Sequence, residues 1–384
     1  MQRACIAVVA AFLLLGSARA QTAHQLWSMK LTGEGGIQTF DRGGRAIWLR
    51  QQGVAFLSPE RLVIYQVNRR LEVAPLAKRG PSGGSGNYIL LARVLDPRTG
   101  REIKRFRLVT SAESSSILPT HDGKFVIRAG KLLALYSADF EMLAAREMHE
   151  GQAPVDYWQV AVTPSGRQVV AAHQQLRVDP GSPLDTSKTK SQTDLEFLDA
   201  DTFAIVRKMH LPHHIPAWAP HEQFLLITTP GKMLFDSGAA VGVMDFEGHW
   251  KRLQHPWMDK KSQCIYNFDL LEHDLMAARG CNDLTVFEPS GEKILSLTAG
   301  NMRRFTSVAG ADHSLAVEIS EFDVPTARLP GMEPAQIDVY DLITREKTMS
   351  VKVEAASVNY AVSKDGLLAV VDGDTLAVYE AQKE

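Results

Sequence analysis

Short apolar stretches alternate with acidic or small polar turns along the whole 384-residue chain. In the most regular copies an Asp or Glu directly follows an apolar stretch, and a second stretch begins a few positions later. The clear copies lie at Arg93–Gly100, Phe197–Thr202, Val243–Gly248, Val286–Gly291 and Val339–Thr344, with a weaker copy at Leu135–Asp139 and a truncated one at Val378–Ala381. A spacing of roughly 40 to 50 residues between copies is typical of a repeat architecture.

A second pattern precedes each copy of the first. It is a turn of the Ser-Pro-Asp-Gly type, followed by a stretch rich in Val, Leu and Ile such as Phe125–Arg128 or Gln168–Ala172. Proline presets φ for such a turn, and Gly or Asn-like residues accept a positive φ. The turns lie at Ser58–Arg61, Thr120–Gly123, Thr163–Gly166, Ala219–Glu222, Leu271–Asp274, Gly310–His313 and Ser363–Gly366. These seven turns predict seven repeating units.

Each unit is predicted to contain four strands, a to d, joined by a tight a–b turn, a b–c connection and a tight c–d turn. That is the four-stranded antiparallel blade of a β-propeller. Because such strands cannot bury a face alone, neighbouring blades must stack radially, and β-branched and aromatic residues suit the twisted sheets. We therefore expect an all-β fold, a seven-bladed β-propeller that forms a single domain over residues 21–384.

The last unit ends after strand c, at Val378–Ala381. His24–Leu31, near the beginning of the chain, is an alternating segment that belongs to no unit of its own. We expect this N-terminal strand to join the last blade as its outer strand d. The two chain ends would then meet in one sheet and close the ring without a covalent link.

The chain resembles the WD40-like and YVTN-type secreted β-propellers of bacteria over essentially its whole length after residue 20. The Asp-x-x-Thr-Gly turn at Asp96–Gly100 and the Ser-Pro-Asp-Gly turns carry the resemblance. The Trp-Asp dipeptide of WD40 repeats and a literal Tyr-Val-Thr-Asn are absent. The resemblance therefore implies an architecture and no particular activity.

Residues 1–20 have the features of a secretory signal peptide. Arg3 lies near the start, an apolar run covers Ala4–Leu15, and small residues at Ser17–Ala20 form a cleavage site before Gln21. The apolar run is shorter than the roughly 20 residues that a membrane-spanning helix requires. We therefore expect a periplasmic or secreted protein with no membrane span.

The charge balance of the expected mature chain is mildly acidic. Without Arg3 and Arg19 the 42 basic residues fall to 40, against 44 acidic ones, and no basic stripe stands out. This balance argues against nucleic acid as a partner. We expect a monomer that carries no cofactor.

Two cysteines, Cys264 and Cys281, remain once Cys5 leaves with the signal peptide. They are placed symmetrically about a predicted hairpin turn between Glu272 and His273, so they would lie opposite each other on neighbouring strands. In an exported chain such an isolated pair favours a structural disulfide over a metal or redox site.

The two faces of the predicted disc differ in their connections. The a–b and c–d turns share one face and are tight, whereas the b–c and d–a connections share the other face and are long. Insertions on one face of a repeat protein often mark its binding face, although surface loops also lengthen without any functional consequence. The b–c insertions lie at Asn68–Asn87, Val178–Thr193, Pro230–Ala239 and Ser320–Ala335.

Several histidines are expected in the d–a connections, among them His210. Imidazoles that converge near a central channel can bind a transition metal, but the spacing matches no zinc pattern. We favour solvated or hydrogen-bonded histidines, and metal binding stays open. The candidate binding residues of this face are His213, His214, His255, Trp257, Trp158, Arg303 and Arg304.

The sequence offers little support for catalysis. A catalytic triad is defined by geometry, which one sequence does not give. Leu95–Glu102 is similar to the turn of the tryptophan-docking repeats of exported quinoproteins, but the trailing Trp is missing. No catalytic residue of a lactonase-like propeller can be aligned. Five acidic residues fall in repeat turns, where we expect them to bond local backbone N–H groups: Asp139, Asp199, Asp245, Glu288 and Asp341.

We therefore expect an exported binding or scaffolding propeller, not an enzyme, that recognises a protein, peptide or small ligand on its b–c and d–a face. The alternative is a propeller enzyme with its site at the central channel of that face. Such an enzyme would be lactonase-like, a hydrolase or lyase, or quinoprotein-like, and would use His213, His214 or His255.

Overall fold

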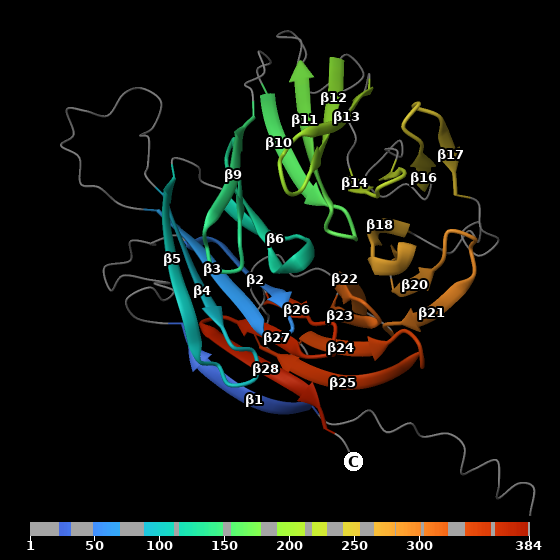
Figure 1. The fold of residues 1–384 in the computed structure, drawn as a ribbon. Coiled ribbons are helices and arrows are strands. Elements are labelled where there is room, and N and C mark those ends of the chain that lie inside the picture. Colours follow the sequence, from blue (N-terminus) through green and yellow to red (C-terminus); the bar gives the residue numbers. More distant parts are fainter. Residues whose placement is uncertain are drawn as a thin grey trace, which may run out of the picture.

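The computed structural model describes residues 23–31, 49–69, 88–110, 115–148, 155–177, 190–211, 217–228, 241–253, 265–280, 282–300, 303–321, 335–354 and 358–382. Within these ranges, strands β1 to β28 form seven four-stranded antiparallel sheets. Figure 1 shows the sheets arranged as blades around a common centre. The predicted seven-bladed β-propeller is confirmed.

Blades 1 to 6 each consist of four consecutive strands, which take the positions a to d in chain order. Blade 1 contains β2 (Leu49–Ser58), β3 (Arg61–Arg69), β4 (Tyr88–Leu95) and β5 (Glu102–Thr110). Blade 2 contains β6 (Ser115–Pro119), β7 (Phe125–Ala129), β8 (Leu132–Tyr136) and β9 (Met142–Glu147). Blade 3 contains β10 (Val155–Val162), β11 (Gln168–Arg177), β12 (Lys190–Asp199) and β13 (Ile205–Leu211).

The second half of the ring repeats this order. Blade 4 contains β14 (Ala217–Pro220), β15 (Leu225–Thr228), β16 (Val241–Met244) and β17 (Trp250–Arg252). Blade 5 contains β18 (Ile265–Leu270), β19 (Met276–Gly280), β20 (Asp283–Phe287) and β21 (Lys293–Thr298). Blade 6 contains β22 (Arg303–Ala311), β23 (Ser314–Glu321), β24 (Ala335–Asp341) and β25 (Glu346–Val353). Short 3₁₀ turns, η2 (His121–Gly123) and η4 (Glu272–Asp274), form two of the a–b turns.

Blade 7 is assembled from both ends of the chain, as predicted. Its strands a to c are β26 (Val358–Val362), β27 (Leu368–Asp372) and β28 (Thr375–Ala381), and its outer strand is β1 (Ala23–Lys30). The β1–β28 register begins with Ala23 opposite Ala381 and ends with Lys30 opposite Thr375. Just beyond it, the backbone N–H of Leu31 donates to the carbonyl oxygen of Asp374 at 2.7 Å.

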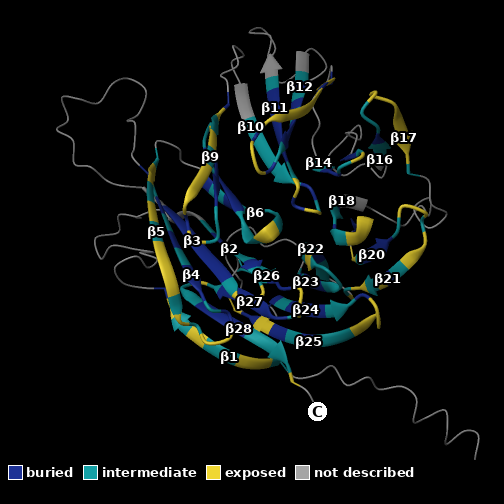
Figure 2. Ribbon diagram, viewed as in Figure 1, coloured by how far each residue is buried: buried dark blue, intermediate teal, exposed yellow. Residues whose placement is uncertain are grey.

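Apolar clusters lie between neighbouring blades all the way around the ring. Between blades 2 and 3, for example, Val126 and Leu135 of one sheet pack with Val169 and Leu198 of the next. Figure 2 shows burial concentrated on the inner strands and exposure on outer strands such as β5 and β17. Radial stacking therefore supplies the apolar partner that a single blade lacks.

The acidic residues of the c–d turns act mostly as predicted. One carboxylate oxygen of Asp199 accepts the backbone N–H groups of Asp201 and Thr202 at 3.2 and 3.0 Å. Asp341 and Asp245 also accept backbone N–H groups within their own turns. Asp139 and Glu288 depart from the prediction. A serine of the same turn, Ser137 or Ser290, takes the local backbone bond in each case, and Glu288 accepts the Ser290 hydroxyl. The Asp139 carboxylate instead pairs with Arg61 of blade 1 at 2.6 Å.

The four predicted insertions do separate strands b and c of their blades. The loops themselves, residues 70–87, 178–189, 229–240 and 322–334, lie outside the described residues. Cys264 and Cys281 also lie outside them, so the disulfide stays a prediction. No helix among the described residues has the length and apolar character needed to cross a membrane.

Candidate functional site

The structure describes three of the seven predicted binding residues. His213, His214, His255 and Trp257 lie outside the described residues. Trp158 lies in β10 of blade 3. Arg303 and Arg304 are the first residues of β22 in blade 6, and Arg303 donates to the carbonyl oxygen of Ile319 at 3.3 Å. The structure therefore does not bring Trp158 and the two arginines into one site.

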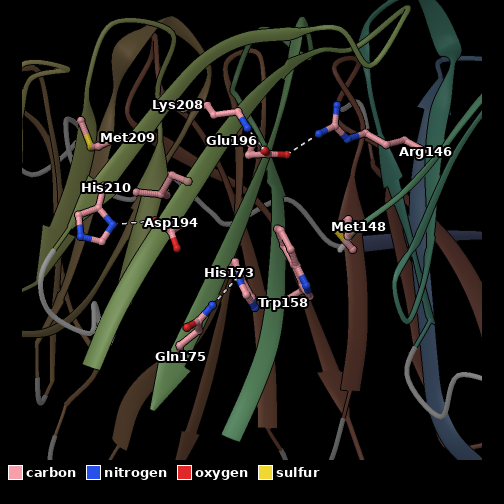
Figure 3. A pocket seen from close by; sticks show the side chains of 11 residues that line it. Arg146, Met148, Trp158, His173, Gln175, Asp194, Glu196, Lys208, Met209 and His210 are labelled. Carbon is pink, nitrogen blue, oxygen red and sulfur yellow. Dashed lines mark hydrogen bonds and ion pairs between the residues drawn. The ribbon is translucent and has the colours of Figure 1, made fainter. Parts of the chain in front are cut away.

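A pocket of about 510 Å³ lies between blades 2 and 3 (Figure 3). It contains Trp158 and ten residues that were not in the predicted binding set. Blade 2 contributes Arg146 and Met148, and blade 3 contributes all the others. Its lining residues are Arg146, Met148, Trp158, His173, Gln175, Asp194, Leu195, Glu196, Lys208, Met209 and His210.

One row of side chains crosses the whole of blade 3. In the strand registers Trp158 lies opposite His173, His173 opposite Asp194, and Asp194 opposite His210. Because residues directly opposite each other in a sheet point to the same face, this row lines one side of the blade. Glu196 and Lys208, which are also opposite each other, form a second row beside it.

The floor of the pocket is a stacked pair of rings. The Trp158 indole and the His173 imidazole lie 4.4 Å apart between centroids, with 12° between their planes. His173 is buried, and the side-chain amide of Gln175 donates to its Nδ1 at 3.3 Å. Arg128 of blade 2 donates to the carbonyl oxygen of Trp158. Trp158 and Met148, which both line the pocket, also belong to the packing of the apolar cluster between the two blades.

Ion pairs form the outer wall of the pocket. Glu196 accepts Arg146 Nη2 at 2.5 Å on one carboxylate oxygen and pairs with Lys208 Nζ at 2.8 Å through the other. Arg146 belongs to β9, so this contact ties blade 2 to blade 3. The Nδ1 of His210 donates to Asp194 at 2.7 Å. The pocket therefore contains two cations, Arg146 and Lys208, and two carboxylates, Asp194 and Glu196.

The pocket lies on one side of blade 3, across the middle of its strands. His173 lies mid-way along β11 and Asp194 mid-way along β12, whereas His210 lies near the end of β13, just before the d–a connection. His210 was expected in that connection itself; the structure places it inside the strand, because its backbone continues the pairing with β12. Binding on the b–c and d–a loop face stays a prediction.

Comparisons with known proteins support the architecture. No protein-family model matches the chain, and no curated protein matches it significantly. The chain has the β-propeller fold. Among solved structures it is similar to the Pyrococcus furiosus trilobed protease β-propeller domain, with a TM-score of 0.53, 9% identity and coverage of 88% of this chain and 96% of that one.

Two further solved structures resemble this propeller. For the Neurospora crassa Pan2 WD40 domain the TM-score is 0.52 at 12% identity, with 95% of this chain and 97% of that one covered. For the Pyrococcus horikoshii acylaminoacyl peptidase the TM-score is 0.55 at 8% identity, over 88% of this chain. The match spans about half, 53%, of the peptidase. At these identities the likeness concerns the fold alone.

Sequence reasoning missed most of the pocket, although a pattern for it exists. Three strands of blade 3 carry polar residues two positions apart, at His173 and Gln175, at Asp194 and Glu196, and at Lys208 and His210. A strand face that packs fully on the next blade would carry apolar residues at these positions. Polar residues at this spacing in three consecutive strands indicate one polar face on one blade.

Proposed function

We propose that this protein is a non-catalytic binding propeller that holds a peptide segment of a partner protein in the pocket between blades 2 and 3. We further propose that it works as a monomer. The signal-peptide features of residues 1–20 support a location in the periplasm or outside the cell. The pocket carries the proposal: its volume of about 510 Å³ lies within the range of ligand sites, roughly 300 to 1,000 Å³.

The chemistry of the lining favours a peptide over a small ion. Trp158 and His173 offer a flat aromatic surface to an apolar side chain, and aromatic residues are common anchors of interfaces. Gln175 and Asp194 add an amide and a carboxylate, which suit the donors and acceptors of a peptide backbone. Arg146 and Lys208 lie beside Asp194 and Glu196, so side chains of both charges are available to a bound peptide.

A random-peptide display library, panned on the purified protein, tests the proposal. Each selected peptide is synthesised with a fluorophore, and its affinity is measured by anisotropy. Trp158→Ala should weaken binding at least about thirtyfold, the loss expected for an interface anchor worth roughly 2 kcal/mol. Asp194→Asn should weaken it less.

Trp250→Ala is the matched control. Trp250 is exposed on β17 in blade 4 and does not line the pocket, so its removal should leave peptide affinity unchanged. Circular dichroism spectra confirm that each variant is folded. If no peptide is selected, or if the selected peptides bind Trp158→Ala and Asp194→Asn as tightly as the parent, the assignment is wrong.

A further inference from the structure

A group of side chains of metal-ligand type lies in two neighbouring a–b turns, outside the pocket. The a–b turns of blades 5 and 6 bring together His273, Asp312 and His313. His273 Nε2 lies 2.6 Å, and His313 Nε2 3.5 Å, from the same Asp312 carboxylate oxygen. Each residue offers one ligand atom, and these atoms lie within 4.8 Å of one another.

The donor types and their accessibility match a metal site. Imidazole nitrogens suit zinc, copper, iron and nickel, and two histidines with one carboxylate leave coordination positions open. The two imidazole rings are stacked, with centroids 4.9 Å apart and 11° between their planes, and both Nε2 atoms lie within 3.5 Å of one Asp312 oxygen. His273 is about half exposed, so an ion can reach the group from solvent.

We propose that His273, Asp312 and His313 bind one divalent transition-metal ion, with zinc as the reference ion, and that this ion links blade 5 to blade 6. The ion takes the place of the proton that His273 Nε2 shares with Asp312. Water completes the coordination. The site is separate from the peptide pocket and does not depend on that assignment.

The blade 5 turn keeps an unusual backbone at this point. His273 and Asp274 both have positive φ, 57° and 60°. At the position of Asp274 the turns of blades 2 and 7 have Gly123 and Gly366, which accept such a φ without strain. A non-glycine residue in this region costs about 1–2 kcal/mol. The Asp274 carboxylate accepts a hydrogen bond from His221 Nε2 at 2.6 Å. This bond fixes the strained turn of blade 5 to blade 4.

A cation lies near the group and would oppose a bound metal ion. It is Lys364 of blade 7, and its ammonium pairs with Glu272 at 3.1 Å. Asp312 contributes the carboxylate oxygen that both histidines approach.

A similar set of residues elsewhere serves as a control. Asp245, Glu247 and His249 also offer three ligand atoms close together, but all three belong to one exposed c–d turn of blade 4. There Asp245 already accepts both the backbone N–H and the Nδ1 of His249, at 2.8 and 3.0 Å. The hydrogen bonds of this turn alone explain why the three residues lie close together.

Zinc titration of the full chain, purified without a histidine tag, tests the site. Calorimetry should give one equivalent of Zn²⁺, and Co²⁺ should give a visible spectrum typical of nitrogen and oxygen ligands. His313→Ala and Asp312→Asn should each weaken Zn²⁺ binding at least about tenfold. His249→Ala should leave it unchanged. Zn²⁺ should also raise the melting temperature of the wild type, because a ligand of the native state stabilises it.

Three outcomes overturn the proposal: no saturable Zn²⁺ binding, binding that survives both His313→Ala and Asp312→Asn, or binding that His249→Ala removes. His313→Gln provides a second, milder variant should His313→Ala not fold, and circular dichroism establishes which variants are folded. A lower Zn²⁺ affinity in folded His313→Gln, with wild-type affinity in His249→Ala, supports the site.

Discussion

The indole nitrogen of Trp27 donates a hydrogen bond to the carbonyl oxygen of Pro97, 2.8 Å away. Trp27 lies in the closing strand β1 of blade 7, and Pro97 lies in the c–d turn of blade 1. The same indole covers Gly100 of that turn, where a Cβ would lie 2.7 Å from Trp27 Cδ2. A repeat turn of the first blade therefore receives the strand that closes the ring.

Gly100→Ala should destabilise the protein through this contact. Gly100 and Gly373 both have positive φ, 71° and 61°, so alanine at either position costs backbone energy. Among the described residues, a Cβ at Gly373 meets nothing within 4 Å, whereas one at Gly100 meets the Trp27 indole. We expect Gly100→Ala to lower the free energy of unfolding by about 1–3 kcal/mol more than Gly373→Ala. Urea denaturation measures both, and equal losses would show that the indole moves aside freely.

Arg279→Met should leave a carboxylate without its partner. Arg279 is buried in β19, donates to Asp269 at 3.0 Å and also donates to the Thr306 carbonyl oxygen of blade 6. Burial raises the pKa of Asp269, and Arg279 partly offsets this effect. We expect a loss of about 3 kcal/mol, the lower end for a buried pair, because a third of the Asp269 side chain is exposed.

The double variant Arg279→Met/Asp269→Leu checks the cause of that loss. It removes the unpaired carboxylate, so it should unfold with a higher free energy than Arg279→Met alone. A double variant no more stable than the single one would assign the loss to the Thr306 contact.

Glu196→Gln should loosen the contact between blades 2 and 3. Glu196 pairs with Arg146 across the blade boundary and with Lys208 within its own blade. Glu102 also holds two arginines, Arg93 and Arg105, but both belong to blade 1. Hydrogen exchange should therefore quicken in both β9 and β13 in Glu196→Gln, whereas Glu102→Gln should affect blade 1 only. An unchanged rate of hydrogen exchange in β9 of Glu196→Gln would contradict this expectation.

Ion pairs between blades should make the ring sensitive to acid. The pKa of Asp139 is lowered, chiefly by the hydrogen bond from Arg61, and that of Asp201 chiefly by the hydrogen bond from Lys124; each pair joins two neighbouring blades. A lowered folded pKa adds stability above the ordinary aspartate pKa of about 4, and this stability is lost as pH falls through the lower folded value.

The variant Asp139→Asn/Asp201→Asn should therefore be less stable than the wild type at neutral pH and should lose less stability below about pH 4. Thermal melts across this range measure the effect. Because both carboxylates are exposed, about 1 M salt should shrink the difference in stability. A steeper acid loss in the variant than in the wild type would contradict the assigned sign.

The fold could be predicted from the sequence because its turns have strict local requirements. Gly123, Gly166 and Gly366 all have positive φ in a–b turns, and the acidic c–d residues Asp199 and Asp341 bond their own backbones. These needs recur with each blade and are visible in one sequence. The closing strand could be predicted because the last unit lacked a strand and the chain began with one unused.

The site could not be predicted in the same way, because its contacts join residues of different blades. Arg146 and Glu196 lie fifty positions apart, and their pairing requires blades 2 and 3 to be placed side by side. His273 and Asp312 lie thirty-nine positions apart, in turns that resemble the structural turns of other blades. Of the residues that line the pocket, the predicted binding set contained Trp158 and none of the neighbours that complete it.

The pairing of β1 with β28 also sets an order of events during folding. Ala23 and Ala381 are partners, so this contact spans nearly the whole chain, and contacts between distant positions form slowly. During synthesis β1 is made first among the described strands, but it cannot pair until β28 has been made. In pulsed hydrogen exchange β1 should gain protection after blades 2 to 6, and earlier protection of β1 would contradict this order. Until β1 pairs with β28, the ring remains open at blade 7.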